Sequence, residues 1–217
     1  ITYIKYIADY INKKETGLTI YTADVAQAVA KQYRIDITQA KKVVNVNLKR
    51  LMEAEDIERF QKGIYYKTKK TPFGKTKLNP NYIITDKYVK RDDQIFGYET
   101  DDTFLNKLGL TTQIPKYKYI ATNYYKNNGY QKNDTLYTAL RKPKTTVTKE
   151  NYKYLQILDV IENREKTSID AINPNKVLNR YLKENDIDFR KLIAFAGKYY
   201  GEEALKGIAE IAQEELI

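Results

Sequence analysis

The chain of 217 residues contains no cysteine and no histidine, and its single serine is Ser168. Without cysteine it forms neither disulfides nor thiolate metal sites. Without histidine it lacks an imidazole general base and a histidine metal ligand. The Ser–His and Cys–His pairs that most often serve as nucleophile and base therefore cannot form. It also contains neither a G-x-x-x-x-G-K-[ST] nor a G-x-G-x-x-G phosphate loop. We therefore expect a protein that is not an enzyme and that has no metal or cofactor.

Long apolar runs are also missing, both of the length that spans a bilayer and of the kind typical of a signal peptide. The composition, 42% hydrophobic and 12% aromatic, is nevertheless sufficient for a core. We expect a soluble, cytoplasmic protein with no membrane partner. The 21 tyrosines are spread along the chain, and we interpret them as codon bias of an AT-rich genome. A surface for stacking single strands would concentrate aromatics beside a basic groove.

The net charge of +10 is unevenly distributed. Residues 1–91 hold 19 Lys and Arg against 9 Asp and Glu, residues 92–149 hold 9 against 6, and residues 150–217 hold 10 against 13. A basic segment of this kind attracts polyanions and gains a salt-dependent term from each phosphate contact. A solvated basic face without a partner is the alternative explanation.

Apolar residues recur at helical spacing in residues 2–14 and 22–33, which predicts two amphipathic helices. A third helix is predicted from Thr38, as its cap, to Leu51. With Val44 at the centre of the inner face, a step of about 100° per residue places four more apolar residues there: Ile37, Ala40, Leu48 and Leu51. The outer face then holds Thr38, Gln39, Lys42, Asn45, Val46, Lys49 and Arg50.

A short hairpin follows the third helix, with Gly63 at its turn. This order is typical of a winged helix-turn-helix, whose helix enters a major groove while the wing lies on the DNA backbone. Gln and Asn can bind adenine, and Lys can reach guanine or phosphate. The exposed Val46 could pack on a thymine methyl or on another part of the protein. The predicted DNA-binding residues are Thr38, Gln39, Lys42, Asn45, Val46 and Lys49 on the helix, and Arg59, Lys62, Lys67, Lys69 and Lys70 in and after the wing.

The pattern predicts an α+β protein: a winged helix-turn-helix domain over residues 1–78, and a second domain over residues 79–217 that is mixed to about residue 150 and helical afterwards. Residues 69–78 resemble a loop or linker. The strands expected in the second domain are Tyr82–Thr85, Lys118–Asn123, Thr135–Leu140 and Thr145–Thr148. A helix containing Phe104, Leu105 and Leu108 should end at Gly109, and Asn173-Pro174 should begin another.

One run of the second domain carries a family resemblance. Gly97-Tyr-Glu-Thr, Phe104-Leu-Asn-Lys-Leu-Gly-Leu-Thr-Thr-Gln-Ile-Pro115 and Ile120-Ala-Thr-Asn123 resemble the AbiEi-type antitoxins of type IV toxin–antitoxin systems, more narrowly a branch known as a domain of unknown function. Gly63-Ile-Tyr-Tyr66 and Thr71-Pro-Phe-Gly74 match the same pattern.

The resemblance implies a winged helix that binds inverted operator repeats in double-stranded DNA and represses its own operon. Two copies on one operator would be a homodimer or two monomers side by side. It also implies a C-terminal domain that counters a nucleotidyltransferase-like toxin without a stable complex.

Two other hypotheses compete with this one. The winged helix could contact protein, with the acidic C-terminal segment docking on the basic N-terminal one. Alternatively, the acidic pairs Asp92-Asp93 and Asp101-Asp102 could hold Mg²⁺ in an enzyme that acts on nucleic acid.

Overall fold

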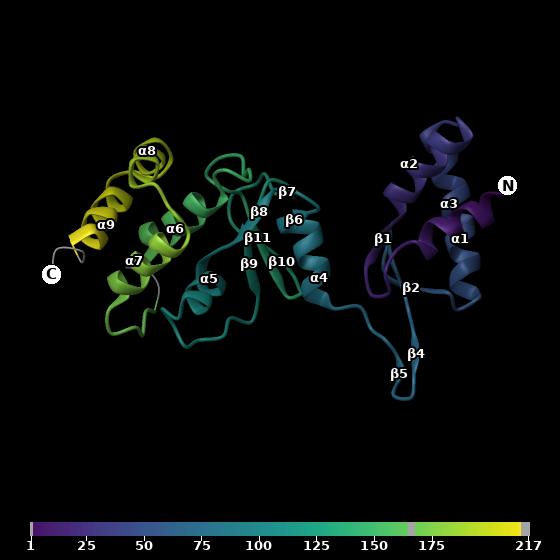
Figure 1. Cartoon of the computed structure of the whole chain (residues 1–217), viewed down its shortest axis with the longest axis horizontal. Coiled ribbons are helices and arrows are strands. Elements are labelled where there is room, and N and C mark those ends of the chain that lie inside the picture. The colour runs from purple at the N-terminus through teal and green to yellow at the C-terminus, as the bar shows by residue number, and fades with distance from the viewer. Residues whose placement is uncertain (1, 165–167, 214–217) are drawn as a thin grey trace. The chain divides into compact units, whose positions relative to one another are not determined.

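The computed structural model describes residues 2–164 and 168–213. The chain forms an α+β protein that divides into two compact units, residues 1–83 and 84–217. The units thus divide at residue 83, where the sequence placed the boundary at 78. Figure 1 labels helices and strands of both units.

The first unit has the element order of a winged helix-turn-helix, α1–β1–α2–α3–β2–β3, followed by a small second hairpin. Its elements are α1 (Tyr3–Asn12), β1 (Thr19–Tyr21), α2 (Thr22–Tyr33), α3 (Ile37–Glu53), β2 (Ile57–Gln61), β3 (Ile64–Lys67), β4 (Lys70–Thr71) and β5 (Gly74–Lys75). Strand β3 lies between β1 and β2 in an antiparallel sheet. The helical periodicity of the sequence therefore predicted α1, α2 and α3.

Helix α3 is fixed to the unit by one apolar face. Ala40, Val44 and Leu48 are fully buried, and they share a core with residues of α1 and α2. The expected inner position Ile37 is wrong, since this side chain is 38% exposed in the first turn. The expected cap is also wrong: Asp36 caps the helix, accepting hydrogen bonds from the backbone N–H of Thr38 at 2.7 Å and of Gln39 at 3.3 Å. Cap and core together set which face of α3 points outward.

Strands β2 and β3 form the wing, and their pairing shifts by one residue at Phe60. The turn at Gly63 has φ of +81°, a conformation that glycine adopts without strain. Tyr66 is buried and its hydroxyl donates to the Glu58 carboxylate at 2.7 Å across the strands. Burial, together with Glu58, raises the pKa of Tyr66 to about 12, so the phenol remains a donor. The wing is thus held in one register by a side-chain pair as well as by its ladder.

The stretch expected to be a loop contains a second hairpin, β4–β5. Two further hydrogen bonds extend it: Lys69 N–H donates to the side-chain Oγ1 of Thr76, and Thr76 N–H donates to the Lys69 carbonyl. Figure 1 shows this hairpin projecting from the first unit. Two-residue strands carry too little periodic signal to be recognised in a sequence.

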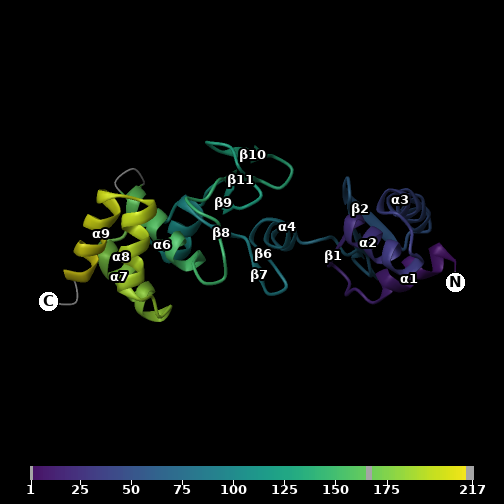
Figure 2. The ribbon, with the colours of Figure 1, turned by 90° about the horizontal axis from the view of Figure 1, so that it is seen from above.

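The second unit joins a four-stranded sheet to a group of helices (Figure 2). Its elements, with α4 crossing the unit boundary, are α4 (Pro80–Ile84), the π-helix η1 (Thr85–Val89), β6 (Lys90–Arg91), β7 (Gln94–Ile95), β8 (Gly97–Glu99), α5 (Asp101–Leu108), β9 (Lys118–Thr122), β10 (Gln131–Asn133), β11 (Thr138–Arg141), α6 (Tyr152–Asn163), α7 (Pro174–Glu184), α8 (Phe189–Tyr199) and α9 (Glu202–Gln213).

Three strand predictions in this unit need correction. The segment Tyr82–Thr85 is helical because Asn79 and Pro80 begin a helix, with Pro80 at its first position. Only the end of Thr135–Leu140 is extended, and residues 145–148 form no strand. The strand at Lys118, the helix that ends at Gly109 and the Asn173 cap are confirmed.

The sheet has the order β10-β11-β9-β8, with β11 and β9 parallel and the outer pairs antiparallel. Gly97 on β8 is enclosed by backbone: a Cβ there would lie 2.1 Å from the Tyr88 carbonyl oxygen and 2.8 Å from that of Ala121. Only glycine fits this position.

Helices α5–α9 share one apolar core, built around Leu158, Ile161, Leu182, Leu192 and Ile208. Helix α9 approaches α6 closely at Gly207, where a Cβ would lie 2.4 Å from Ile161 Cγ2. Beside the helices, a smaller cluster of Tyr98, Ala121, Val147 and Leu155 joins the sheet to α6.

Candidate nucleic-acid interface

The outward face of α3 carries the predicted base readers. Thr38, Gln39, Lys42, Asn45, Val46 and Lys49 are all exposed. They lie one, three or four residues apart, so they form a contiguous strip along the helix. The same geometry buries the neighbouring Asn47, whose amide donates to the Val43 carbonyl at 2.8 Å and is therefore turned away from the strip.

This strip is chemically mixed in a way that suits base edges. It offers the amides of Gln39 and Asn45, the ammonium of Lys42 and, between them, the apolar Val46, which is 53% exposed. Lys49 makes a loose ion pair with Glu53 at 3.8 Å, and both side chains are largely solvated. Such a pair holds its lysine weakly, which leaves it able to turn to a phosphate.

The three basic residues of the wing differ in exposure and in the hydrogen bonds that they make to the protein. Arg59 and Lys62 are exposed, with Lys62 beside the Gly63 turn. Lys67 is half-buried, and its ammonium donates to the carbonyl oxygens of Lys14 at 2.9 Å and Asn12 at 3.2 Å. Two of its three N–H groups thus join β3 to the end of α1, which leaves one for a ligand.

The second hairpin carries the predicted Lys69 and Lys70 and adds Phe73, which sequence reasoning missed. Lys75 lies 3.3 Å from Glu55 and 3.4 Å from Glu58, and Lys70 lies 3.5 Å from Glu55, so the hairpin rests against the turn between α3 and β2. At its tip the ring of Phe73 is fully exposed. Lys69, next to Lys70, is also exposed. The motif Thr71-Pro-Phe-Gly74 was the available signal for this projecting apolar tip.

Neither acidic pair is arranged as a site for a hard cation. Asp92 and Asp93 are exposed in the turn between β6 and β7. Asp101 accepts from Tyr130 Oη and from Arg141 Nε, the latter at 3.2 Å. Among residues 2–164 and 168–213, no group of three His, Cys, Asp or Glu side chains is placed to hold a metal ion.

The sequence profile of a family of unknown function, DUF6088, matches residues 6–187. The chain belongs to this family. The match includes the whole of α3, the wing and the sheet of the second unit, so the DUF6088 pattern spans both units. No curated protein matches the sequence. In the described part of the chain, no helix has the length and apolar character needed to cross a bilayer.

Charge separates the two units of this DUF6088 protein. Residues 1–83 hold 16 Lys and Arg against 8 Asp and Glu, a net charge of +8, whereas residues 84–217 hold 22 against 20. The unit that presents the polar strip and the wing therefore also carries most of the positive charge. Such a surface can bind a phosphate backbone and place amide and ammonium groups against base edges.

Proposed function

We propose that this protein is a DNA-binding transcriptional regulator that acts in the cytoplasm as the antitoxin of a toxin–antitoxin pair. One observation carries the DNA-binding half of the proposal. The strip of polar residues on α3 is exposed along its length, beside a basic wing and in the unit with a net charge of +8.

In the proposed complex α3 lies in the major groove. Gln39 and Asn45 read adenine, Lys42 reads guanine or phosphate, and Val46 packs on a thymine methyl. Lys62, Arg59, Lys69 and Lys70 contact the backbone and fix the register. Phe73 projects from the tip of the second hairpin, β4–β5, which also carries Lys70. An apolar side chain in this position can enter a minor groove while the lysines contact phosphates.

The antitoxin half rests on the resemblance of residues 97–123 to AbiEi-type antitoxins. Repression of the operon and neutralisation of the toxin would belong to different units, DNA binding to residues 1–83 and the action against a nucleotidyltransferase-like toxin to residues 84–217. Repression requires affinity and position only, which agrees with a chain that has no histidine and no cysteine.

A gel-shift titration tests the DNA-binding half. The full chain should retard DNA from upstream of its own gene at physiological salt, and it should bind a scrambled fragment of equal length at least tenfold more weakly. Absence of any shift would favour a module in which the winged helix binds protein instead.

Co-expression tests the antitoxin half. The full chain should restore growth of cells that express the nucleotidyltransferase-like gene next to its own. A variant with Lys42, Lys49 and Lys62 changed to alanine should still restore growth while losing repression. Failure of the wild type to restore growth would remove the antitoxin half and leave the DNA-binding half intact.

A further inference from the structure

The second unit contains its own basic and aromatic segment. Residues 116–149 hold eight Lys and Arg against one acidic residue, Asp134, and they include six tyrosines. This segment has a net charge of +7, whereas the second unit as a whole has +2. Three of these tyrosines are well exposed: Tyr124 at 66%, Tyr130 at 45% and Tyr137 at 57%. Six of the 21 tyrosines of the chain thus lie in the segment that carries the net positive charge of this unit.

The segment also lines three adjoining hollows. The first, of about 610 Å³, lies between the sheet, the start of α5 and the end of α6. The second, of about 340 Å³, shares Tyr130, Arg141 and Lys144 with the first. The third, of about 560 Å³, shares Lys142 and Lys144 with the second. The three hollows are therefore neighbours along the loops 123–130 and 141–146, and we treat them together as one groove.

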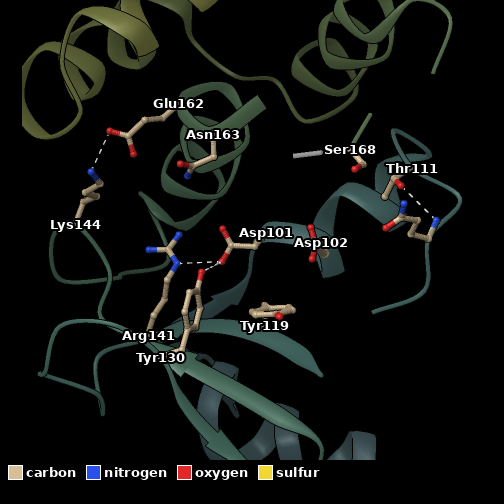
Figure 3. Close-up of a pocket in the computed structure, with 11 residues that line it drawn as sticks. Asp101, Asp102, Thr111, Tyr119, Tyr130, Arg141, Lys144, Glu162, Asn163 and Ser168 are labelled. Carbon is tan, nitrogen blue, oxygen red and sulfur yellow. Dashed lines mark hydrogen bonds and ion pairs between the residues drawn. The ribbon is translucent and has the colours of Figure 1, made fainter. Parts of the chain in front are cut away.

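Tyr130 lies between the first and second hollows, where two contacts fix its ring. Its hydroxyl donates to Asp101, and its ring meets that of Tyr119 edge-on, with centroids 5.3 Å apart and planes at 83° (Figure 3). A ring that is fixed at its hydroxyl and its edge, yet 45% exposed, loses little entropy when a flat ligand stacks on it.

Arg141 supports this arrangement rather than binding ligand. Its guanidinium donates to Asp101, Asp159, Thr100 and the Lys142 carbonyl, and it is mostly buried. Burial alone would lower the pKa of Arg141, but the carboxylates of Asp159 and Asp101 raise it, so the group remains charged. Asp101 and Arg141, which lie beside Tyr130 in the groove wall, are therefore held in place without a ligand.

The positive charge available to a ligand comes from two other residues. Lys126 and Lys142 are exposed, line the third hollow together, and form no ion pair with the described part of the chain. Lys144, between the first and third hollows, is paired with Glu162 at 3.0 Å and lies over the Tyr200 ring. The amides of Asn127 and Asn128 line the second hollow. Free ammonium groups along a groove are suited to a row of phosphates.

We propose that this groove of the second unit binds single-stranded nucleic acid. A base stacks on Tyr130, with its edge towards the polar first hollow, and the phosphates that follow lie on Lys142 and Lys126. A duplex is a poor fit, because a base within a duplex exposes no face to a side chain in a hollow. The proposal is independent of the DNA-binding role of α3, since it concerns other residues and another unit.

The test uses the full chain with Lys42, Lys49 and Lys62 changed to alanine, which weakens the binding proposed for the first unit. Fluorescein-labelled twelve-nucleotide poly-uridine and poly-thymidine strands are titrated, and anisotropy is measured at low and at physiological salt. Added Lys126→Ala and Lys142→Ala should weaken binding at least tenfold and flatten its salt dependence. The control pair Lys176→Ala and Lys191→Ala removes the same charge from exposed positions on α7 and α8 and should leave binding unchanged.

Tyr130 supplies a second, charge-neutral comparison. Tyr130→Phe keeps the ring and should bind within about twofold of its parent, whereas Tyr130→Leu removes the ring and should bind about tenfold more weakly. Equal loss in the control pair, equal binding by the phenylalanine and leucine variants, or no binding by the parent would overturn the proposal. Uridine monophosphate that competes as well as the strand would also overturn it in favour of a mononucleotide pocket.

Discussion

The ammonium of Lys67 donates to the carbonyl oxygen of Lys14 at 2.9 Å, which links the last strand of the wing to the segment after α1. Lys62, five residues earlier at the tip of the same wing, is exposed. From the sequence, both lysines are predicted to contact phosphate. In the structure, Lys67 is engaged in hydrogen bonds to the protein, whereas Lys62 is free to reach a ligand.

Alanine substitution should therefore separate the two lysines. Lys62→Ala should leave thermal stability unchanged and reduce the slope of log K against log salt by about one. Lys67→Ala should lower the melting temperature, because it removes two hydrogen bonds between distant segments, and should change the salt slope less than Lys62→Ala does. Calorimetry and anisotropy on the same preparations measure both, and a melting temperature for Lys67→Ala equal to that of the wild type would contradict the structural role.

Gln39 and Asn45 should control which sequence is bound rather than how strongly DNA is bound in general. Changing either residue to alanine should reduce affinity for the operator by about 1–3 kcal/mol and relax preference at one position of the site. Affinity for scrambled DNA should remain as in the wild type. Lys5, exposed on α1, provides a control outside the interface. Equal losses on operator and scrambled DNA would mean that α3 contacts only the backbone.

Gly97 should tolerate no side chain. Gly97→Ala places a Cβ against the Tyr88 and Ala121 carbonyl oxygens, and we expect it to lower the free energy of unfolding by about 3 kcal/mol or more. Gly197 on α8 has open space and helical backbone, so Gly197→Ala should raise stability by up to about 1 kcal/mol. Urea titration of both variants checks the prediction, which fails if they have equal stability.

Glu99 should make the second unit sensitive to acid. Burial works to raise the pKa of Glu99, but hydrogen bonds and charge from Lys107 and Lys118 overcome it and hold the pKa below 4.5. The Lys118 ammonium lies 2.9 Å from its carboxylate, and the Glu99 side chain is only 12% exposed.

The pKa of Glu99 is lower in the folded protein than in the unfolded chain. The ionised carboxylate therefore contributes its full share of the folding free energy above about pH 4.5, and this contribution is lost as the pH falls through the pKa of the folded protein. Glu99→Gln should therefore cost about 1 kcal/mol at pH 7, discounted for the exposure of Lys107, and almost nothing at strongly acidic pH. Urea unfolding of both proteins at the two pH values measures this. A difference that is independent of pH would show that the carboxylate charge plays no part.

Residue spacing was sufficient to predict the proposed reading face of α3. An amphipathic helix buries one side, so Ala40, Val44 and Leu48 determine where Gln39 and Asn45 point. Its first turn was less predictable, since Thr38 and Asp36 are both good caps and only geometry distinguishes them. The helix at Pro80 was missed although Asn79-Pro80 is a start signal, because the apolar, β-branched residues that follow also suit a strand.

The groove of the second unit could not be predicted from the sequence alone. Tyr130 directly precedes β10, Arg141 is the last residue of β11, and Asp101 begins α5, so their association depends on the tertiary fold. The charge of segment 116–149 could have been counted, but nothing in its spacing shows that Tyr130, Lys126 and Lys142 line neighbouring hollows.

The central claim is that the first unit binds DNA through α3 and the wing. The most direct measurement is the affinity for operator DNA over a range of salt concentrations, for the wild type and for the variant with Lys42, Lys49 and Lys62 changed to alanine. We expect tight, strongly salt-dependent binding by the wild type, and weaker binding with a salt slope reduced by up to about three units in the variant. Equal and salt-independent binding by the two proteins would contradict the account.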